Sequence, residues 1–330
     1  MKMNTKAKLA RGLFGGNSKQ AAGRDGYGEG LLILGEQNKR VVVLCADLNE
    51  STRTDAFART FPERFIQTGV AEQNMAGLAA GIAMEGFIPF MSSFAVFSPG
   101  RNWDQIRISI CYSKANVKIA GAHAGISVGP DGATHQALED IAITRVLPNM
   151  TVVAPADALE TKKATIAMAH RKGPGYLRFS REPSPVFTTE KTPFVIGRAE
   201  VLARGRDVTI IACGLMVYEA LAAAQELEKK HRIQAEVINS HTIKPLDAKT
   251  IIASAKKTGA VVCAEEHQVH AGLGSAVSEA LSEQYPVPMR FVGMPDSFGE
   301  SGTAAELLEK YGMTRGRIIS SVLDVIHVKK

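Results

Sequence analysis

The sequence predicts an α/β protein with two doubly wound domains, of which the second is the smaller. Short apolar runs rich in β-branched residues alternate with segments of helical spacing. A proline-rich stretch interrupts this alternation, which then restarts. Strands that alternate with helices are typical of parallel sheets covered by helices on both faces. A chain of 330 residues is long enough for two such domains, each with its own core.

The first predicted domain covers residues 20–182. Its most distinct strand, RVVVLCADLN, is interpreted as buried because of its β-branched content. Its most distinct helix is rich in Ala and Gly, which allows close packing. The expected strands are 40–49, 65–70, 87–91, 117–121, 151–154 and 176–180, and the expected helices are 25–37, 71–84, 103–112 and 156–170.

The second predicted domain covers residues 197–330 and follows a linker. Residues 183–196 contain three prolines and show no periodicity, which is typical of a linker. Residues 1–19 are basic, contain no acidic residue, and are interpreted as a flexible N-terminal arm; a transit peptide is the alternative. The expected strands are 208–213, 235–238, 260–264 and 289–292, and the expected helices are 217–230, 275–284, 304–311 and 314–327.

Composition excludes several classes of function. A net charge of +6, with no stripe of basic residues interleaved with aromatics, argues against nucleic-acid binding. The longest apolar stretches are strand-sized, so a membrane span is not expected. The four cysteines are far apart, and Cys45, Cys213 and Cys263 lie in apolar runs, where a thiol is usually a buried hydrophobe. A reducing compartment, the cytoplasm, is therefore the expected location.

Candidate site residues follow the predicted strands, because open α/β sheets bind ligands at the carboxyl ends of their strands. Glu72 lies in the first turn of a predicted helix. Taken alone, it is a surface acid favoured by the helix dipole. Phe94 and Phe97 follow the next strand three residues apart, where a flat heterocycle could stack. Core packing is the alternative interpretation of both rings.

The segment 123–136 is unusually polar and flexible for a connection. It contains two histidines, one aspartate and three glycines, and polar loops of this kind often carry function. A metal site formed by His123, Asp131 and His135 is one interpretation. Their spacing, however, matches no standard zinc or iron pattern, and no metal ligand is assigned.

Several motifs resemble those of a known family. GVAEQNMAGLAAGIAMEGFIPF, VGPDGATHQALED, HTIKPLD and FGESGTAAELLEKYG are similar to the C-terminal portion of transketolases, from about Gly23 to the C-terminus. The similarity is greatest to split transketolases, which two genes encode. The resemblance is specific because the motifs occur in the family's order and spacing. It implies a pyrimidine-binding domain followed by a smaller transketolase C-terminal α/β domain.

The resemblance also implies thiamine diphosphate as the cofactor and a role for each matching residue. Glu72 would hydrogen-bond the aminopyrimidine ring and so promote loss of the proton from the thiazolium carbon. Phe94 and Phe97 would line the pyrimidine pocket, with Phe97 as the stacking face. Asp47 would lie near the cofactor and the subunit contact. Gly100 occupies a place where many family members have an aromatic residue, so Arg101 or Trp103 is expected to complete the wall.

The substrate residues are implied in the same way. Arginines, a serine and a histidine bind the sugar phosphate in the family, and arginine suits this task because its planar fork makes two charge-assisted hydrogen bonds. The matching positions are Arg24, Ser51, His123 and Arg181. Asp131 matches the acid that recognises the acceptor hydroxyl. His135 matches the histidine close to the reacting carbonyl and is, with Glu72, a predicted catalytic residue.

One family motif is missing. The diphosphate and Mg²⁺ of this cofactor are held in the family by a GDG motif with a later Asn, and no GDG occurs in this chain. The resemblance therefore implies a partner subunit that carries the diphosphate-binding domain and the Mg²⁺ ligands. We expect a heterotetramer with two copies of each chain, acting on phosphorylated sugars.

Three alternatives remain at this stage. The beta subunit of a 2-oxo acid dehydrogenase has the same two domains, but VGPDGATHQ and Arg181 argue against it. A deoxyxylulose-phosphate synthase shares several of the motifs, but it is normally one chain, and the start near residue 1 argues against it. A non-enzymatic subunit could keep the fold, although Glu72, Asp131 and both loop histidines are present.

Overall fold

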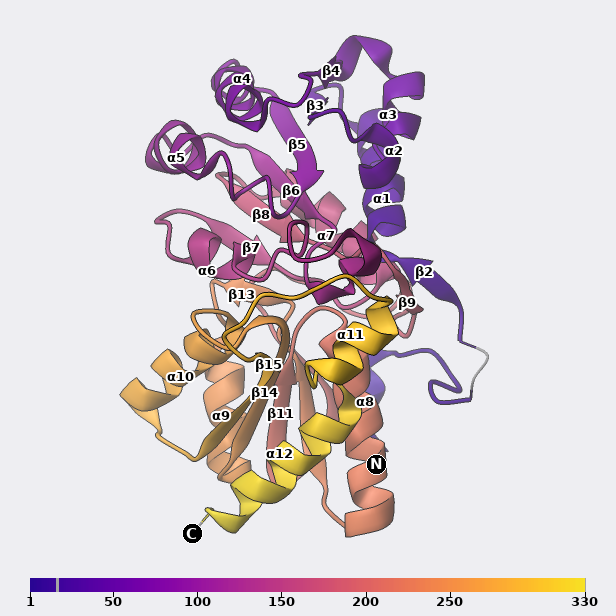
Figure 1. Ribbon diagram of the computed structural model, residues 1–330, viewed down its shortest axis with the longest axis vertical. Helices are drawn as coiled ribbons and strands as arrows, with labels where there is room; N and C mark the ends of the chain where they lie inside the picture. Colours follow the sequence, from indigo (N-terminus) through magenta and orange to yellow (C-terminus); the bar gives the residue numbers. More distant parts are fainter. Residues whose placement is uncertain (16–17, 330) are drawn as a thin grey trace.

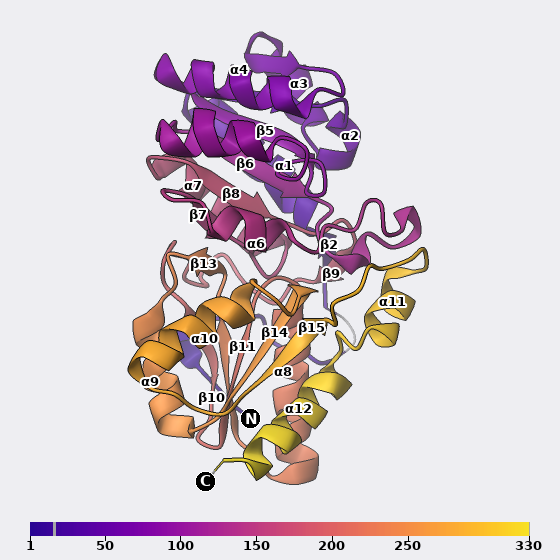
Figure 2. The ribbon, with the colours of Figure 1, turned by 60° about the vertical axis from the view of Figure 1, so that its left-hand side comes forward.

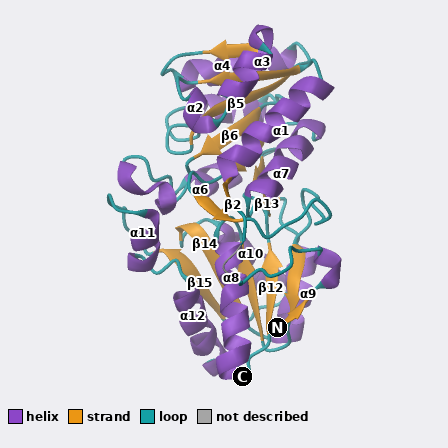
Figure 3. Cartoon of the chain, turned by 90° about the vertical axis from the view of Figure 1, so that its right-hand side faces the viewer, coloured by secondary structure: helices purple, strands orange, loops and turns teal. Residues whose placement is uncertain are grey.

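Two α/β domains are stacked along the long axis of the molecule (Figure 1). The computed structural model describes residues 1–15 and 18–329. Each domain is a sheet with helices on both faces, and the two sheets are clearly separate in the turned views (Figures 2 and 3). The prediction of two α/β domains in series is confirmed. None of the described helices is long and apolar enough to cross a membrane.

The first sheet has seven strands in the order β13-β7-β8-β6-β5-β3-β4, and all neighbours are parallel except β13 and β7. Strand β3 lies between β4 and β5, with Val43 opposite both Phe65 and Phe90. The strands are β3 (Val41–Cys45), β4 (Phe65–Gln67), β5 (Ile88–Phe94), β6 (Lys118–Ala122), β7 (Thr151–Val153), β8 (Gly175–Arg178) and β13 (Thr242–Lys244).

Two groups of helices cover the first sheet. One face carries α1 and α7, whose apolar side chains share a core cluster with β3. The other face carries α4 and η3, which share a second cluster with the same sheet. The elements are α1 (Gly23–Gln37), α2 (Asn49–Thr52), α3 (Asp55–Thr60), η2 (Pro62–Arg64), α4 (Glu72–Met84), α5 (Trp103–Gln105), η3 (Ile106–Tyr112), η4 (Ile126–Asp131), α6 (Asp140–Arg145) and α7 (Ala158–His170).

The second sheet has six strands in the order β1-β10-β12-β11-β14-β15, and the last four in this order, β12, β11, β14 and β15, are parallel. Helices α9 and α10 lie on one side of it, and α8 and α12 lie on the other (Figure 2). The elements are β10 (Glu200–Arg204), β11 (Val208–Ala212), α8 (Met216–Glu226), η5 (Leu227–His231), β12 (Ala235–Asn239), α9 (Ala248–Thr258), β14 (Val261–Gln268), α10 (Leu273–Gln284), β15 (Met289–Met294), α11 (Ala304–Lys310) and α12 (Arg315–His327).

The N-terminal segment differs from the flexible arm expected from the sequence. Strand β1 (Lys2–Met3) pairs with β10, and η1 (Thr5–Ala7) buries Ala7 completely. Leu13 is also buried in the core of the second domain. The apolar residues that are interspersed with lysines in this segment pack against the second domain and hold the segment there. Residues 16 and 17, which belong to the predicted arm, lie outside the described residues.

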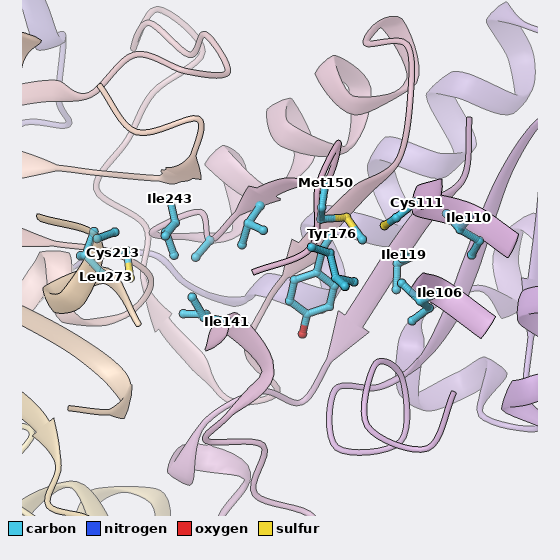
Figure 4. Packing of buried hydrophobic residues seen from close by; sticks show 14 of the residues in the cluster. Ile106, Ile110, Cys111, Ile119, Ile141, Met150, Tyr176, Cys213, Ile243 and Leu273 are labelled. Carbon is cyan, nitrogen blue, oxygen red and sulfur yellow. The ribbon is translucent and has the colours of Figure 1, made fainter. Parts of the chain in front are cut away.

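The predicted linker also contains structure, because β9 (Pro183–Pro185) pairs with β2 (Gln20–Ala22). The two domains share more than this connection. Strand β13 belongs by sequence to the second domain but extends the first sheet. One apolar cluster runs from Ile110 and Ile119 in the first domain to Cys213 and Leu273 in the second (Figure 4). The domains are therefore joined by a continuous core.

Candidate active site

Five neighbouring parallel strands direct their carboxyl ends to one edge of the first sheet. Arg181 follows β8, His123 follows β6, Phe94 ends β5, Asp47 follows β3, and Glu72 follows β4. Asp47 and His123 have left-handed backbone torsions, with φ of 58° and 54°. Such torsions are uncommon outside glycine and gather at functional sites. The strand order therefore brings these predicted residues to one edge.

Glu72 is a buried carboxyl group at the first position of α4, with a relative exposure of 1%. Ser93 Oγ donates a hydrogen bond to Oε1 at 3.4 Å, and Arg101 Nη1 donates to Oε2 at 2.7 Å. Asn102 Nδ2 donates to the Glu72 carbonyl oxygen at 3.1 Å. A buried carboxyl group is costly unless it has partners. This burial distinguishes Glu72 from the surface acid that its position alone suggests.

An aromatic group lies beside this carboxyl group. The rings of Phe94 and Phe97 are 6.1 Å apart and nearly parallel. Phe94 stacks on His123, with ring centroids 4.1 Å apart, and His135 lies edge-on to Phe97 at 5.4 Å. Phe94 is buried in the core, whereas Phe97 is only partly buried. Phe97 therefore offers the face on which a flat ligand could stack.

Arg101 occupies that face in the structure. Its guanidinium carbon lies 4.7 Å from the centroid of Phe97, while the same group pairs with Glu72. Trp103, the other candidate for the pocket wall, donates from Nε1 to the carbonyl oxygen of Ile143 at 2.7 Å. Its indole N–H is thus engaged with α6 rather than with Glu72. The place of the Arg101 guanidinium therefore suits a planar group that stacks on Phe97 and hydrogen-bonds Glu72.

The predicted phosphate-binding residues meet at a backbone carbonyl. His123 Nε2 lies 3.2 Å from the Ser51 carbonyl oxygen, and Arg24 Nη1 donates to the same oxygen at 3.3 Å. Burial, followed by the charges of Arg24 and Arg181, lowers the pKa of His123 to about 3, so its ring is neutral. Arg24 Nε and His123 Nδ1 are buried and have no hydrogen-bond partner in the described part of the chain. Ser51 takes part through its carbonyl rather than its hydroxyl group.

Arg181 and Asp131 form an ion pair on the same side of the site. Arg181 Nη1 donates to Asp131 Oδ1 at 2.9 Å and to the carbonyl oxygen of Val128 at 3.1 Å. The pair is about one-third exposed. His135 contacts Thr134, whose Oγ1 lies 2.9 Å from Nδ1. Arg181 thus contacts the loop that carries both predicted histidines, at Val128 and Asp131.

Asp47 lies apart from this group. Its side chain is exposed, and its backbone N–H donates to Gln67 Oε1 at 2.8 Å. No hydrogen bond within the described residues joins it to Glu72 or Phe97. Its expected place near a subunit contact stays a prediction.

Some site residues were not predicted from the sequence. Ser93 and Asn102 hold the two ends of Glu72, and neither was singled out. Ser93 lies in a continuous run of buried residues along β5, and Asn102 lies just before α5, so only tertiary packing identifies them. In residues 1–15 and 18–329, no group of three or more His, Cys, Asp or Glu side chains is arranged to hold a metal ion.

Comparison with known proteins gives two family matches. The family described as "Transketolase, pyrimidine binding domain" matches residues 19–185, and "Transketolase, C-terminal domain" matches residues 197–318. The chain belongs to the transketolase family. The resemblance found in the sequence is thereby confirmed, and the chain is a transketolase-family subunit of the split type.

Individual relatives cover nearly the whole chain. The 6-deoxy-6-sulfo-D-fructose transketolase subunit SqwH of Clostridium sp. (strain MSTE9) is 44% identical over 93% of this chain and 95% of its own length. An apulose-4-phosphate transketolase subunit of Phocaeicola vulgatus is 37% identical over 92% and 97%. A solved split-gene transketolase, described as an inactive β4 tetramer, is 50% identical with a TM-score of 0.88 over 94% and 99%.

Proposed function

We propose that this chain is the C-terminal subunit of a two-chain transketolase that performs thiamine-diphosphate-dependent ketol transfer. The donor is a ketose phosphate or a similar anionic ketose, and the acceptor is an aldose. The observation that carries the proposal is the arrangement of Glu72 and Phe97, which hold the planar guanidinium of Arg101 by hydrogen bonding and stacking. An aminopyrimidine ring is also flat and hydrogen-bonding, so these residues fit the cofactor.

Each residue of the pocket has a defined task in this proposal. Thiamine diphosphate supplies a thiazolium carbon that becomes nucleophilic when it loses its proton. Glu72, held by Ser93 and Asn102, would hydrogen-bond the pyrimidine ring nitrogen. Phe97 supports the ring by stacking. Arg101 would have to move for these residues to hold the cofactor, because its guanidinium lies over Phe97 and pairs with Glu72.

His123 and His135 act at the sugar. His135 lies edge-on to both phenylalanines, next to the expected position of the reacting carbonyl, and exchanges protons with it. His123 is neutral and its Nε2 donates to the Ser51 carbonyl oxygen, so its buried Nδ1 is a free acceptor that suits a sugar hydroxyl group. The buried Nε of Arg24 is a free donor that suits a ligand anion, and Arg181 adds a positive charge.

The second subunit supplies the rest of the cofactor site. This chain contains no GDG motif, so the diphosphate and Mg²⁺ ligands come from an N-terminal transketolase subunit, and the active assembly is a heterotetramer. Two relatives are named as subunits, and the related split-gene chain is described as inactive when it forms a β4 tetramer. These descriptions support dependence on a partner.

The identity of the sugar is a separate question. The two named relatives act on different ketoses, one carrying a sulfonate and the other a phosphate. Both groups are anions, and both suit a site with Arg24 and Arg181. Common pentose and heptose phosphates therefore compete with less usual ketoses as candidates.

The test is reconstitution of the pair. The chain is co-expressed with its partner subunit, supplied with thiamine diphosphate and Mg²⁺, and screened with ketose phosphates and ketose sulfonates against aldehyde acceptors. We expect two-carbon transfer only when both chains are present. Oxidative decarboxylation of a 2-oxo acid would instead favour the dehydrogenase alternative, and full activity of the single chain would refute the need for a partner.

A further inference from the structure

The loop that carries His123, Asp131 and His135 also contacts the second domain. It follows β6 and contains η4, whose residues from Ile126 to Gly129 are buried. Helix α11 of the second domain packs directly against η4, as both ribbons show (Figures 1 and 2). All of the candidate site residues predicted from the sequence lie in the first domain. The contacts of the second domain with the loop suggest a role closer to the chemistry.

The firmest tie is made by Glu266, near the end of β14. Its Oε1 accepts a hydrogen bond from the backbone N–H of Ser127 at 2.6 Å. Gly125 lies so close that a Cβ added there would meet the Glu266 carboxyl group at 2.3 Å. Arg178 Nη2 donates to the backbone oxygen of Glu266 at 2.6 Å, which anchors the strand to the first domain. Both Glu266 and Ser127 are buried.

A second tie comes from the FGESG segment that precedes α11. Gln136 Nε2 donates to the carbonyl oxygen of Glu300 at 2.9 Å and lies 3.3 Å from that of Ile126. A Cβ on Gly299 would come within 2.0 Å of Gln136 Oε1, and one on Gly132 would come within 2.6 Å of Ser301 Oγ. The loop and this segment therefore fit together without space for side chains at the glycines.

We propose that Glu266 is a positioning residue, through which the C-terminal domain fixes the loop bearing the substrate-binding histidines and Asp131. The effect on catalysis rests on the proposed function, but the clamp itself, which is the hydrogen bond from the Ser127 N–H to Glu266, does not. Loss of the Glu266 carboxyl group leaves the buried Ser127 N–H without a partner, which is costly, and frees the loop to move. Displacements of about 1 Å near reacting groups are enough to lower rates roughly a hundredfold.

The adjacent residue provides a matched control. Glu265 lies on the same strand, is equally buried, and also accepts backbone hydrogen bonds, but from Leu273 and Gly274 at the start of α10. Successive strand residues point to opposite faces, so Glu265 does not touch the loop. Glu266→Ala and Glu265→Ala therefore remove the same group in the same setting, and Glu266→Gln retains an acceptor oxygen.

The first measurement is hydrogen exchange on the full chain alone. We expect Glu266→Ala to speed exchange in residues 123–136 at least tenfold, Glu265→Ala to affect only the start of α10, and Glu266→Gln to restore most of the protection. Unchanged exchange in the loop of a folded Glu266→Ala chain would overturn the proposal. If this variant does not fold, Gln136→Met, which cuts the second tie, is measured and judged in the same way.

The second measurement uses the reconstituted pair. We expect Glu266→Ala to raise the KM for phosphorylated substrates about tenfold or more, with thiamine diphosphate affinity unchanged, and Glu265→Ala to leave both near the wild-type values. A loosened loop with an unaltered KM would overturn the positioning role. If the wild-type pair shows no ketol transfer, the proposed function fails, while the exchange result still decides whether the clamp exists.

Discussion

Replacement of Arg101 by leucine should tighten binding of thiamine diphosphate. In the structure its guanidinium pairs with Glu72 and stacks on Phe97, which is the place proposed for the pyrimidine ring. The cofactor must therefore displace it. Arg101 is about half-exposed, so screening limits the ion pair to about 1 kcal/mol, and the stacking adds roughly 0.5–1 kcal/mol.

The removed competition amounts to about 1–2 kcal/mol, or roughly a 5- to 30-fold lower Kd. Isothermal titration calorimetry of the reconstituted pair with thiamine diphosphate and Mg²⁺ measures it. Arg107, exposed on η3, is the matched control, and Arg107→Leu should leave the Kd unchanged. A weaker or equal affinity in Arg101→Leu would show that Arg101 assists the cofactor or is indifferent to it, and the displacement argument would fail.

Three further predictions concern Glu160, Gly125 and Arg181. Burial, with the charge of Asp157, raises the pKa of Glu160 from 4.5 to about 7. The protonated group stabilises the fold fully below pH 4.5, and this contribution is lost as the pH rises through 7. In urea titrations the wild type should therefore lose about 3 kcal/mol of unfolding free energy over this range, whereas Glu160→Gln should not, and parallel curves of unfolding free energy against pH would contradict this. Gly125→Ala should destabilise the chain by about 2 kcal/mol or more, because its φ is +89° and its Cβ would strike Glu266; thermal unfolding checks it, and an unchanged Tm would refute the crowding. Arg181→Met should raise the KM for anionic sugars about tenfold or more in steady-state assays while sparing kcat, and an equal KM would remove Arg181 from the site.

The alternation of strands and helices was enough to predict both domains and most core elements. Helix 71–84 begins in the structure at Glu72, and the strand at 208–213 corresponds to β11 (Val208–Ala212). Local pattern could not reveal β13, which lies by sequence among second-domain residues and completes the first sheet. Helix α9 was also missed. The expected helix 103–112 is a short α5 followed by a π-helix, a difference that hydrophobic spacing does not resolve.

The site was predicted chiefly through residues that follow strands. Strand order explains why these residues lie together, because parallel neighbours bring distant segments to one edge. The pattern could not give the partners of those residues. The Arg101 guanidinium on Phe97, the shared Ser51 carbonyl and the reach of Glu266 into the loop depend on side-chain placement across domains. The basic N-terminal segment shows the same limit, because its apolar residues pack only once the second sheet exists.

The central claim is that the buried carboxyl group of Glu72 activates a cofactor that this chain binds together with a partner. The most direct measurement is the rate of hydrogen–deuterium exchange at the thiazolium carbon of thiamine diphosphate bound to the reconstituted pair. Glu72→Gln keeps the size of the side chain and removes its ionisable proton. We predict a fall in this rate of about a hundredfold or more with the cofactor still bound. Exchange as fast as in the wild type would contradict the account.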